Sequence, residues 1–480
     1  MVGTKDIVEQ NAWWRIERWE EFDKHLLTLR DNPFRIERNK ITKESQVNLI
    51  YGPRQVGKTT FIKLMIKRLI NDKVDTEKIG YFSCDALITN KRDELREVIN
   101  FFLARNIEYL FIDEISNVNG WGFEVKYFID SGKFDNMKVF ITGSPFGMQE
   151  HLPGRKLSHF YLMPISFREF LINLKLNLNE KVIPAFNLKR IEIDEIKKLI
   201  EVLNSTIYDL GNLKDLRSKI RKIENHFIII EKLFLVYLII GGFPSVINSH
   251  IKYRTEGNKV YLFDEIQTVK ERLIDSLRKA GKKEGICFQL IGSIKKRLSS
   301  RYSFTQLKET EIDLSKETII NYLNHLKDIF LLKIIYAYNF GKNEIGWKKD
   351  KKIYLLDPFL YHEELILDQD KILTNEEFLG KLVESISAIN FSYLKEDFLN
   401  PLETFLFFWY NSKEIDFIIK HKSLIAIETK FRRKIDKVNK IDQVKKYVVL
   451  TKNLFEYKED VIFVPASIFL MLLKNKSCYL

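Results

Sequence analysis

The stretch that decides the fold of the first domain is Gly52-Pro53-Arg54-Gln55-Val56-Gly57-Lys58-Thr59-Thr60. It contains the pattern GxxxxGK(S/T), follows an apolar run at Val47–Tyr51 and precedes a helical segment at Thr59–Ile70. In such a strand–loop–helix context, backbone N–H groups and the helix N-terminus face bound phosphates. We therefore predict that these nine residues contact ATP, with Lys58 reaching the β- and γ-phosphates and Thr59 a ligand of Mg²⁺. The alternative is a glycine-bearing turn before a helix.

An acidic pair at the end of a second apolar run fits the same chemistry. Asp113 and Glu114 come directly after Tyr109–Ile112, which reads as a buried parallel strand. We predict that Asp113 holds Mg²⁺ through water and that Glu114 polarises the attacking water as general base. Without the preceding phosphate loop, this pair would be an ordinary strand end exposed to solvent.

A third strand tip supplies polar side chains near the expected γ-phosphate. Val139–Ile141 is followed by Thr142, Gly143 and Ser144. Thr142 and Ser144 are candidates to contact the γ-phosphate or the water, and a simple turn at Gly143 is the equally weighted alternative.

Apolar runs and helical stretches alternate from residue 47 to about residue 166, which predicts a parallel α/β sheet. The expected strands are Val47–Tyr51, Gly80–Ser83, Tyr109–Ile112, Lys138–Ile141 and Phe160–Ile165. The preceding residues 1–45 read as a helical arm containing three tryptophans: Trp13, Trp14 and Trp19.

The composition points to a folded protein with an anionic partner. The 480 residues are 45% hydrophobic and 30% charged, and 78 basic against 65 acidic residues give a net charge of +13. That excess favours nucleic acid as the partner. Three widely spaced cysteines without metal-ligand spacing, and no signal peptide, predict a cytoplasmic location. The longest apolar run, Leu233–Ile247, is too short to span a bilayer, so we expect no membrane association.

Several short motifs in this order resemble a known family. They are GPRQVGKTT, FIDE, ITGS, LPGR, PISFREF (Pro164–Phe170) and GGFPSV (from Gly241). The chain resembles archaeal and bacterial AAA+-type ATPases with a C-terminal nuclease-like domain, over about residues 30–480. The resemblance implies ATP hydrolysis, an Mg²⁺ cofactor and a possible homo-oligomer. A long insertion at about residues 172–230 departs from the family and puts the lid geometry and subunit contacts in doubt.

The same resemblance gives Arg155 a role as a trans-acting or lid-sensing arginine. A guanidinium can neutralise charge that develops on the γ-phosphate. The alternative is a surface arginine on a loop.

A middle module is predicted to be a winged helix, which the resemblance also implies. Ser315 is a plausible N-cap of a helix at Ser315–Leu332, preceded by a short helix at Phe304–Leu307. One face of the longer helix carries Ile319, Leu323 and Leu326, and the other carries Lys316, Asn321, Asn324 and Lys327. A hairpin follows, Leu332–Tyr338 and Lys352–Leu356, with Lys342, Lys348, Lys349, Lys351 and Lys352 around its loop. The helix would enter a DNA groove and the wing would touch phosphate, or the module packs only on its neighbours.

The last domain carries a second set of candidate catalytic residues. Strands at Phe405–Tyr410, Glu414–Lys420 and Leu424–Glu428 and a helix at Phe378–Phe391 are expected. They carry Glu384, Asp416, Glu428 and Lys430, which match the E…D…ExK set of the PD-(D/E)xK nuclease superfamily. Three carboxylates would bind Mg²⁺ and Lys430 would orient water or neutralise the phosphate. Gln443–Tyr447 resembles the QxxxY helix of the RecB-like branch, and a catalytically inert fold used for binding is the alternative.

Together these patterns predict an α/β protein in five parts: a helical arm (1–45), a P-loop ATPase core (46–170), a helical lid with an insertion (171–285), a winged helix (286–360) and a mixed α/β nuclease-like domain (361–480). The predicted function is ATP hydrolysis coupled to action on DNA, with metal-dependent nuclease activity as an open possibility. The alternatives are a regulatory NTPase that binds protein and has an inactive nuclease fold, or an architectural DNA-binding ATPase of a mobile element or defence system.

Overall fold

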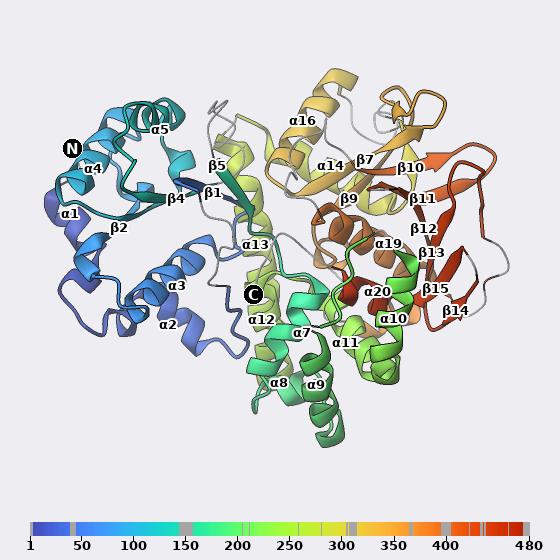
Figure 1. The fold of residues 1–480 in the computed structure, drawn as a ribbon. Helices are drawn as coiled ribbons and strands as arrows, with labels where there is room; N and C mark the ends of the chain where they lie inside the picture. The colour runs from blue at the N-terminus through green and yellow to red at the C-terminus, as the bar shows by residue number, and fades with distance from the viewer. Residues whose placement is uncertain are drawn as a thin grey trace. The chain divides into compact units, whose positions relative to one another are not determined.

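The computed structural model describes residues 3–38, 45–143, 157–203, 205–210, 212–257, 259–279, 281–303, 306, 314–363, 368–394, 405–421, 423–432, 435, 438–458 and 460–473 (Figure 1). The chain forms two compact units, which are treated separately below. The described residues up to Met163 form the first, and those from Pro164 onward form the second.

The first unit is built on a five-stranded parallel sheet with the strand order β2-β3-β4-β1-β5. The strands are β1 (Val47–Tyr51), β2 (Ile79–Ser83), β3 (Tyr109–Asp113), β4 (Lys138–Gly143) and β5 (Leu157–Tyr161). The predicted parallel α/β sheet is thereby confirmed. Every residue of β1 and four of the five residues of β3 are buried, because helices cover both faces of the sheet.

The helices lie on both faces of this sheet. They are α2 (Lys24–Asp31), α3 (Lys58–Asn71), α4 (Arg92–Ala104) and α5 (Trp121–Asp130). From β1 to β2 the chain moves one way across the sheet, and from β2 through β3 to β4 it moves back. Right-handed crossovers then put α3 on one face and α4 and α5 on the other, as Figure 1 shows.

The predicted strand at Phe160–Ile165 is wrong in its bounds. β5 pairs with β1 from Leu157 opposite Val47 to Tyr161 opposite Tyr51. The N–H of Leu162 still donates to the carbonyl of Tyr51 at 2.7 Å. Beyond that point β1 gives way to the phosphate loop, so β5 has no strand left to pair with.

Side chains of the N-terminal arm cover the edge strand β2. The arm contains α1 (Thr4–Glu9) and α2, with two short 3₁₀ turns at Ala12–Trp14 and Trp19–Glu21. The Asn11 amide accepts from the N–H of Tyr81 at 2.7 Å and donates to its carbonyl at 2.9 Å. The indole N–H groups of Trp13 and Trp14 both donate to the carbonyl of Ile79. These contacts satisfy edge groups that would otherwise be open to another strand.

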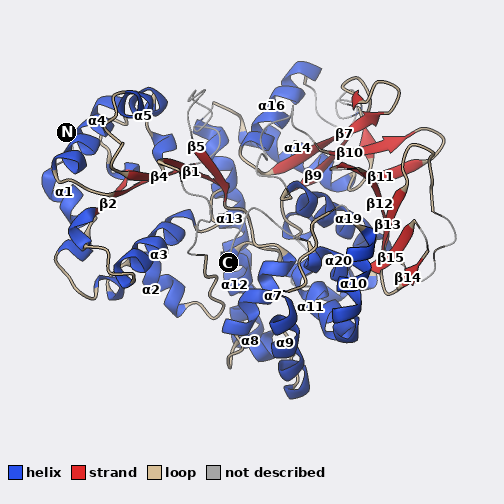
Figure 2. Cartoon of the chain, viewed as in Figure 1, coloured by secondary structure: helices blue, strands red, loops and turns tan. Residues whose placement is uncertain are grey.

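The second unit begins with a long helical region, as predicted. Figure 2 shows this region, from α7 to α14, as helices. These helices are α7 (Phe167–Leu176), α8 (Val182–Ala185), α9 (Arg190–Leu203), α10 (Leu213–Ile223), α11 (Phe227–Ile240), α12 (Pro244–Glu256), α13 (Lys259–Lys279) and α14 (Glu284–Lys296). Among the described residues no single helix is long and apolar enough to cross a membrane. One pair of helices, Leu213–Ile240 with Pro244–Glu256, is long and apolar enough together to cross a membrane, but the two are bent by 106° relative to each other.

A second, mixed sheet of ten strands follows. Its order is β14-β15-β13-β12-β11-β10-β7-β9-β6, and β8 pairs with β7 off this path. The strands are β6 (Arg301–Tyr302), β7 (Leu332–Asn339), β8 (Glu344–Ile345), β9 (Lys351–Leu355), β10 (Leu406–Tyr410), β11 (Glu414–Lys420), β12 (Leu424–Lys430), β13 (Lys446–Thr451), β14 (Glu456–Tyr457) and β15 (Val461–Pro465). The remaining helices are α16 (Lys316–Asp328), α17 (Phe359–His362), α18 (Gln369–Thr374), α19 (Glu376–Ser392) and α20 (Ala466–Leu472).

The helix α16 and the β7–β9 hairpin form where the winged helix was predicted, but α16 ends at Asp328, four residues before the predicted end at Leu332. Ser315 caps α16 by accepting from the N–H of Thr318 at 3.2 Å. The stripe Ile319, Leu323 and Leu326 is buried, and β7 and β9 form the antiparallel hairpin. β7 also pairs in parallel with β10, so the predicted boundary at residues 360/361 divides strands that belong to one sheet. Phe304 and Leu307 of the preceding short helix lie outside the described residues.

The motifs PISF and GGFP, which carried the family resemblance, contact one another in the second unit. The carbonyl of Gly242 accepts from the N–H of Ile165 at 2.9 Å. The N–H of Gly242 donates to the buried carboxylate of Asp357 at 2.8 Å. Gly241 ends α11 at φ 69° and ψ −160°, which is a region that glycine alone adopts readily. The conformation brings three distant segments together without room for a side chain.

Replacing Gly241 by alanine is expected to destabilise the second unit strongly. A Cβ there would lie 1.8 Å from Asp357 Oδ1, in addition to the unfavourable backbone conformation. We expect the free energy of unfolding to fall by about 3 kcal/mol or more, measured by urea denaturation. Gly292→Ala is the matched control, because a Cβ at this position in α14 meets nothing within 4 Å. Equal unfolding midpoints for Gly241→Ala and the wild type would show that Asp357 does not crowd this position.

Candidate nucleotide site and carboxylate cluster

The phosphate loop connects β1 to α3 and depends on two glycines. A Cβ at Gly52 would lie 2.1 Å from the carbonyl oxygen of Leu162. Gly57, immediately before α3, has φ 91°, which favours glycine because it has no Cβ. The loop therefore curls closely against β5 and directs the N-terminus of α3 toward the space that the phosphates would occupy.

Lys58 lies inside the loop, at the first position of α3. Its side chain is 4% exposed, and its ammonium donates to the carbonyls of Gly52 and Pro53, each at 3.2 Å. The same ammonium lies 3.6 Å from Glu114 Oε1. The predicted phosphate-binding lysine and the predicted general base are thus brought together from different elements.

Asp113 is the centre of a buried hydrogen-bond network. Its Oδ2 accepts from Thr59 Oγ1 at 2.6 Å and from the phenol of Tyr81 at 3.2 Å. Its Oδ1 accepts a hydrogen bond from the hydroxyl of Thr142. Burial first, and the Asp113 carboxylate next, raise the pKa of Tyr81 well above its usual value, so the phenol remains a donor. The ends of β2, β3 and β4 and the start of α3 together fix this carboxylate.

Glu114 has a left-handed backbone conformation with φ 51° and ψ 41°. Its N–H donates to Thr142 Oγ1 at 3.1 Å, and its side chain is 22% exposed on the side of Lys58. A non-glycine residue held in this region commonly costs about 1 kcal/mol or more. This turn directly follows Asp113, and it leaves the carboxylate of Glu114 3.6 Å from the Lys58 ammonium.

The remaining predicted ATP contacts lie along the loop or outside the described residues. Pro53 and Val56 are buried, whereas Arg54, Gln55 and Thr60 are half-buried. Thr142 is fully buried, and its hydroxyl bonds Asp113 and the Glu114 N–H. Ser144 and Arg155 lie outside the described residues. Thr142 therefore positions Asp113 and Glu114 through these two hydrogen bonds.

These residues fit a nucleotide with Mg²⁺. The donor set combines a curled glycine loop, a buried lysine and a hydroxyl bonded to a buried carboxylate. Carboxylate and hydroxyl oxygens are the ligands that Mg²⁺ prefers. Thr59 and Asp113 would hold the metal, and Lys58 with the loop backbone would hold the phosphates.

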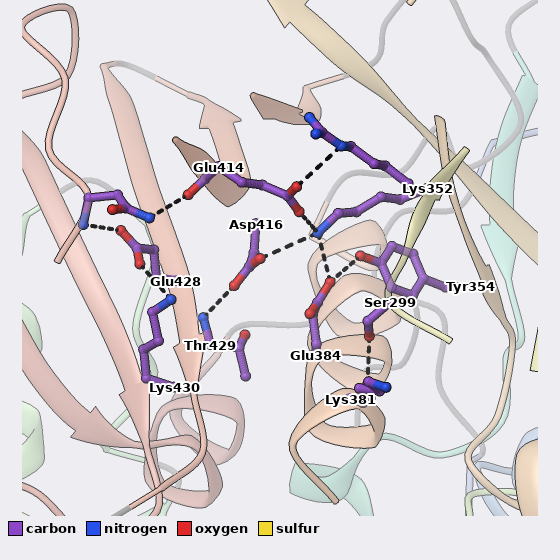
Figure 3. A network of polar contacts seen from close by, with 12 residues as sticks. Ser299, Lys352, Tyr354, Lys381, Glu384, Glu414, Asp416, Glu428, Thr429 and Lys430 are labelled. Atoms are coloured by element: carbon purple, nitrogen blue, oxygen red, sulfur yellow. Dashed lines mark hydrogen bonds and ion pairs between the residues drawn. The ribbon is translucent and has the colours of Figure 1, made fainter. Parts of the chain in front are cut away.

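The second set of predicted residues lies on three elements of the mixed sheet (Figure 3). Glu384 comes from α19, Asp416 from β11, and Glu428 and Lys430 from β12. Glu428 and Lys430 share a strand face as predicted, and Lys430 Nζ lies 3.3 Å from Glu428 Oε2. Figure 3 shows these side chains in one region, together with Lys352, Tyr354 and Glu414.

Lys352 lies between the carboxylates. Its ammonium is 2.7 Å from Glu414 Oε1, 3.0 Å from Glu384 Oε1 and 3.3 Å from Asp416 Oδ1. We predicted that Lys351 and Lys352 contact phosphate from the wing, and this is wrong because both are buried, at 6% and 1% exposure. All five residues of β9 are buried, so the side chains on both faces of this strand point into protein and not into solvent.

Burial changes the protonation of two of the predicted metal ligands. It raises the pKa of Glu384 to about 7, although Lys352 opposes the shift. It also raises the pKa of Glu428 to about 7, against the opposing charge of Lys430. Glu428 Oε1 accepts from the N–H of Asn439 at 2.8 Å. Each of these carboxylates therefore has partners from the protein itself.

The predicted Mg²⁺ ligands of this cluster do not fit a divalent ion in the described structure. Among the described residues no group of three or more His, Cys, Asp or Glu side chains is arranged to hold a metal. The ammonium of Lys352 takes the space between Glu384 and Asp416. No catalytic step through a metal can be derived from this arrangement.

The predicted QxxxY helix is also wrong. Lys446 begins β13, and Gln443 precedes it in a turn. Tyr447 packs in the strand core and its hydroxyl donates to the carbonyl of Ile441 at 3.1 Å. The continuous buried apolar run Tyr447–Leu450, paired on both sides with β12 and β15, forms a central strand here and not a helix.

Sequence reasoning missed four residues that complete these sites. Tyr81 reads as one more aromatic in an apolar strand, and nothing local marks its contact with Asp113. Glu414 stands two residues before Asp416, and Lys352 two before Tyr354, so each pair shares a strand face. That spacing is a usable signal, but it does not reveal which strands face each other.

The comparison with protein families supports the first site. Residues 44–171 match the model of an AAA domain. Residues 231–371 match a domain of unknown function (DUF8612), which covers α11 through α17. A P-loop AAA domain in general implies binding of ATP and Mg²⁺.

The individual proteins and solved structures that resemble this chain share at most 26% of its residues in the comparisons given below. An uncharacterized protein, MJ1544, of Methanocaldococcus jannaschii is 26% identical over 421 residues, covering 85% of this chain and 80% of that protein. Thermotoga maritima RuvB is 13% identical with a TM-score of 0.21, covering 69% of this chain and 89% of that one. Aquifex aeolicus DnaA bound to AMPPCP is 14% identical with a TM-score of 0.22, covering 68% and 93%. These TM-scores are too low to carry a structural argument.

The glycine loop, Lys58, Thr59 and the buried Asp113 occupy the places in a five-stranded parallel sheet that the family match leads one to expect. Residues 44–171 therefore match an AAA domain by sequence, and the described part of this range has the phosphate loop and the acidic strand end that the match implies.

Proposed function

We propose that this chain hydrolyses ATP and uses the hydrolysis in an action on DNA. The single observation that carries the ATPase part is the meeting of Lys58, Thr59, Asp113 and Glu114 at one edge of the parallel sheet. Thr59 and Asp113 are 54 residues apart in the sequence, and the fold brings the two adjacent pairs, Lys58–Thr59 and Asp113–Glu114, within contact distance.

Each residue has a defined task in that reaction. The loop N–H groups and the Lys58 ammonium bind the β- and γ-phosphates, and Thr59 and Asp113 hold Mg²⁺. Bound Mg²⁺ neutralises charge on the phosphate oxygens. Glu114 accepts a proton from the water whose oxygen attacks the γ-phosphorus. Tyr81 and Thr142 keep Asp113 in place by hydrogen bonding.

The DNA part of the proposal rests on the exposed face of α16. Lys316, Asn321 and Asn324 are exposed, opposite the buried stripe of the same helix. Lys327 is half-buried beside Asp328, with 3.5 Å between the charged groups. At the tip of the β7–β9 hairpin, Lys342 and Lys348 are exposed. A polar helix face together with a hairpin that carries exposed lysines is suited to contact groove edges and phosphates.

Salt-dependent DNA binding tests this proposal. We expect non-specific binding of duplex DNA that weakens with salt, and a smaller log–log slope in Lys316→Ala/Lys348→Ala, by about 0.9 for each lost phosphate contact. Fluorescence anisotropy over a salt series measures the slope. Lys5→Ala/Lys73→Ala is the matched control, because it removes two exposed lysines of the first unit and the same total charge.

Absence of DNA binding at low salt, or binding that does not change with salt, would contradict the proposal and favour a regulatory ATPase that binds protein. An equal loss of slope in both double variants would place the contacts elsewhere. A cytoplasmic location and a homo-oligomeric assembly stay predictions.

A further inference from the structure

The carboxylate cluster of the mixed sheet contains its own cation. Lys352 Nζ contacts one oxygen from each of three carboxylates, on Glu384, Glu414 and Asp416, at 2.7–3.3 Å. An ammonium has three N–H donors and no acceptor, so one proton is available for each carboxylate. Figure 3 shows the lysine reaching from β9 to the point where the three acids converge.

Further donors complete the coordination of these acids. The phenol of Tyr354 donates to Glu384 Oε1 at 2.6 Å, and the N–H of Thr429 donates to Asp416 Oδ2 at 2.8 Å. Arg301 Nε lies 3.7 Å from Glu414 Oε2. Glu428 has its own lysine partner in Lys430. The negative charge of the cluster is thus compensated within the protein.

The electrostatics favour a permanent ammonium at this position. Lys352 is 1% exposed, and three carboxylate oxygens within 3.3 Å of its Nζ compensate the positive charge where it is buried. Mg²⁺ binds through a near-octahedral shell of oxygens at about 2.0–2.1 Å and gives up water reluctantly. It would have to displace a buried charge that three carboxylates already hold, and leave that charge without partners.

We propose that Lys352 takes the place of the divalent cation in this nuclease-like cluster, so that the mixed sheet is held together without metal and does not cleave phosphodiesters by metal catalysis. The lysine comes from the predicted wing hairpin, and its partners come from α19 and β11 of the predicted nuclease-like part. The ion pairs therefore fasten these two parts of the sheet together. This inference does not depend on ATP hydrolysis or DNA binding.

The first experiment uses the wild-type chain and Asp416→Asn, both freed of metal with EDTA and without nucleotide. Mn²⁺ binding is measured by calorimetric titration. The proposal expects equal Mn²⁺ uptake by both proteins, because Asp416 contributes no metal site. A stoichiometric Mn²⁺ site in the wild type that Asp416→Asn removes would overturn the proposal, as would Mn²⁺-dependent DNA cleavage that Asp416→Asn abolishes.

The second experiment creates the missing cation site. Lys352→Met keeps the length of the side chain and removes its charge, which leaves three carboxylates facing one another. We expect a thermal midpoint several degrees below that of the wild type, and a partial recovery of several degrees in millimolar Mn²⁺, because a ligand that binds the folded state stabilises it. The wild type is expected to show no such metal response.

Lys351→Met is the matched control for this change. Lys351 is the neighbouring buried lysine of β9, but its ammonium donates to the carbonyls of Trp347 and Lys349. We expect destabilisation without recovery by Mn²⁺. Recovery of equal size in both variants would mean that Mn²⁺ acts elsewhere, and no metal response in a folded Lys352→Met would mean that Lys352 does not stand in for a cation. If Lys352→Met does not fold, the titration of the wild type against Asp416→Asn decides.

Discussion

Replacing Lys58 by alanine is expected to lower the rate of ATP hydrolysis by at least about 100-fold, the cost of removing one preorganised charge from a developing phosphate anion. Lys58 is 4% exposed and lies at the first turn of α3, inside the phosphate loop. The measurement is phosphate release under saturating ATP, together with nucleotide binding.

The fold is expected to persist in Lys58→Ala. The lost contacts are two hydrogen bonds to loop carbonyls and one ion pair with Glu114, and all of them lie at the sheet edge. Lys67→Ala, nine residues farther along α3 and 41% exposed, is the control that should hydrolyse ATP at the wild-type rate. Phosphate release by Lys58→Ala equal to that of the wild type would remove the ATPase proposal.

Replacing Glu114 by glutamine is expected to leave ATP binding intact and to lower the turnover rate by about 100- to 10,000-fold, the usual contribution of a positioned general base. Glutamine keeps the shape and polarity of the side chain but cannot accept the proton of the attacking water. In the described structure Glu114 is paired with Lys58 at 3.6 Å. Phosphates that bind the Lys58 ammonium would release this carboxylate for the reaction.

Single-turnover hydrolysis and a separate binding titration measure the two effects of Glu114→Gln. Glu108→Gln is the matched control, because Glu108 stands immediately before β3, at the opposite end of the strand from Glu114, and pairs with Lys78 at 3.6 Å. It should leave both quantities unchanged. An unchanged turnover rate in Glu114→Gln would assign the base to another residue and leave Glu114 as a strand-end carboxylate.

Local patterns were sufficient for most of the secondary structure around the nucleotide site. The strand Val47–Tyr51, the phosphate loop and the helix α3 are contiguous, so the physical cause of each lies within a few residues. The same holds for the buried stripe of α16 and its cap at Ser315. The bounds of β5 could not be predicted in this way, because they depend on where its partner β1 ends.

The carboxylate cluster shows the opposite case. Its strands and helix were expected from the mixed α/β pattern of this part of the chain, and the shared face of Glu428 and Lys430 followed from the two-residue repeat of a strand. The identity of the cation among the acids did not follow. A lysine in the predicted wing read as a surface residue, since most lysines are exposed.

The sequence by itself therefore determined the phosphate loop, the acidic pair after β3 and the two kinds of sheet, because these depend on residues adjacent along the chain. Only the tertiary structure decided that Tyr81 and Thr142 hold Asp113, and that Lys352 lies between Glu384 and Asp416. The physical reason is that a buried charge or hydroxyl takes its role from the groups that surround it in space. Strand order and helix packing bring those groups together from segments far apart in the sequence.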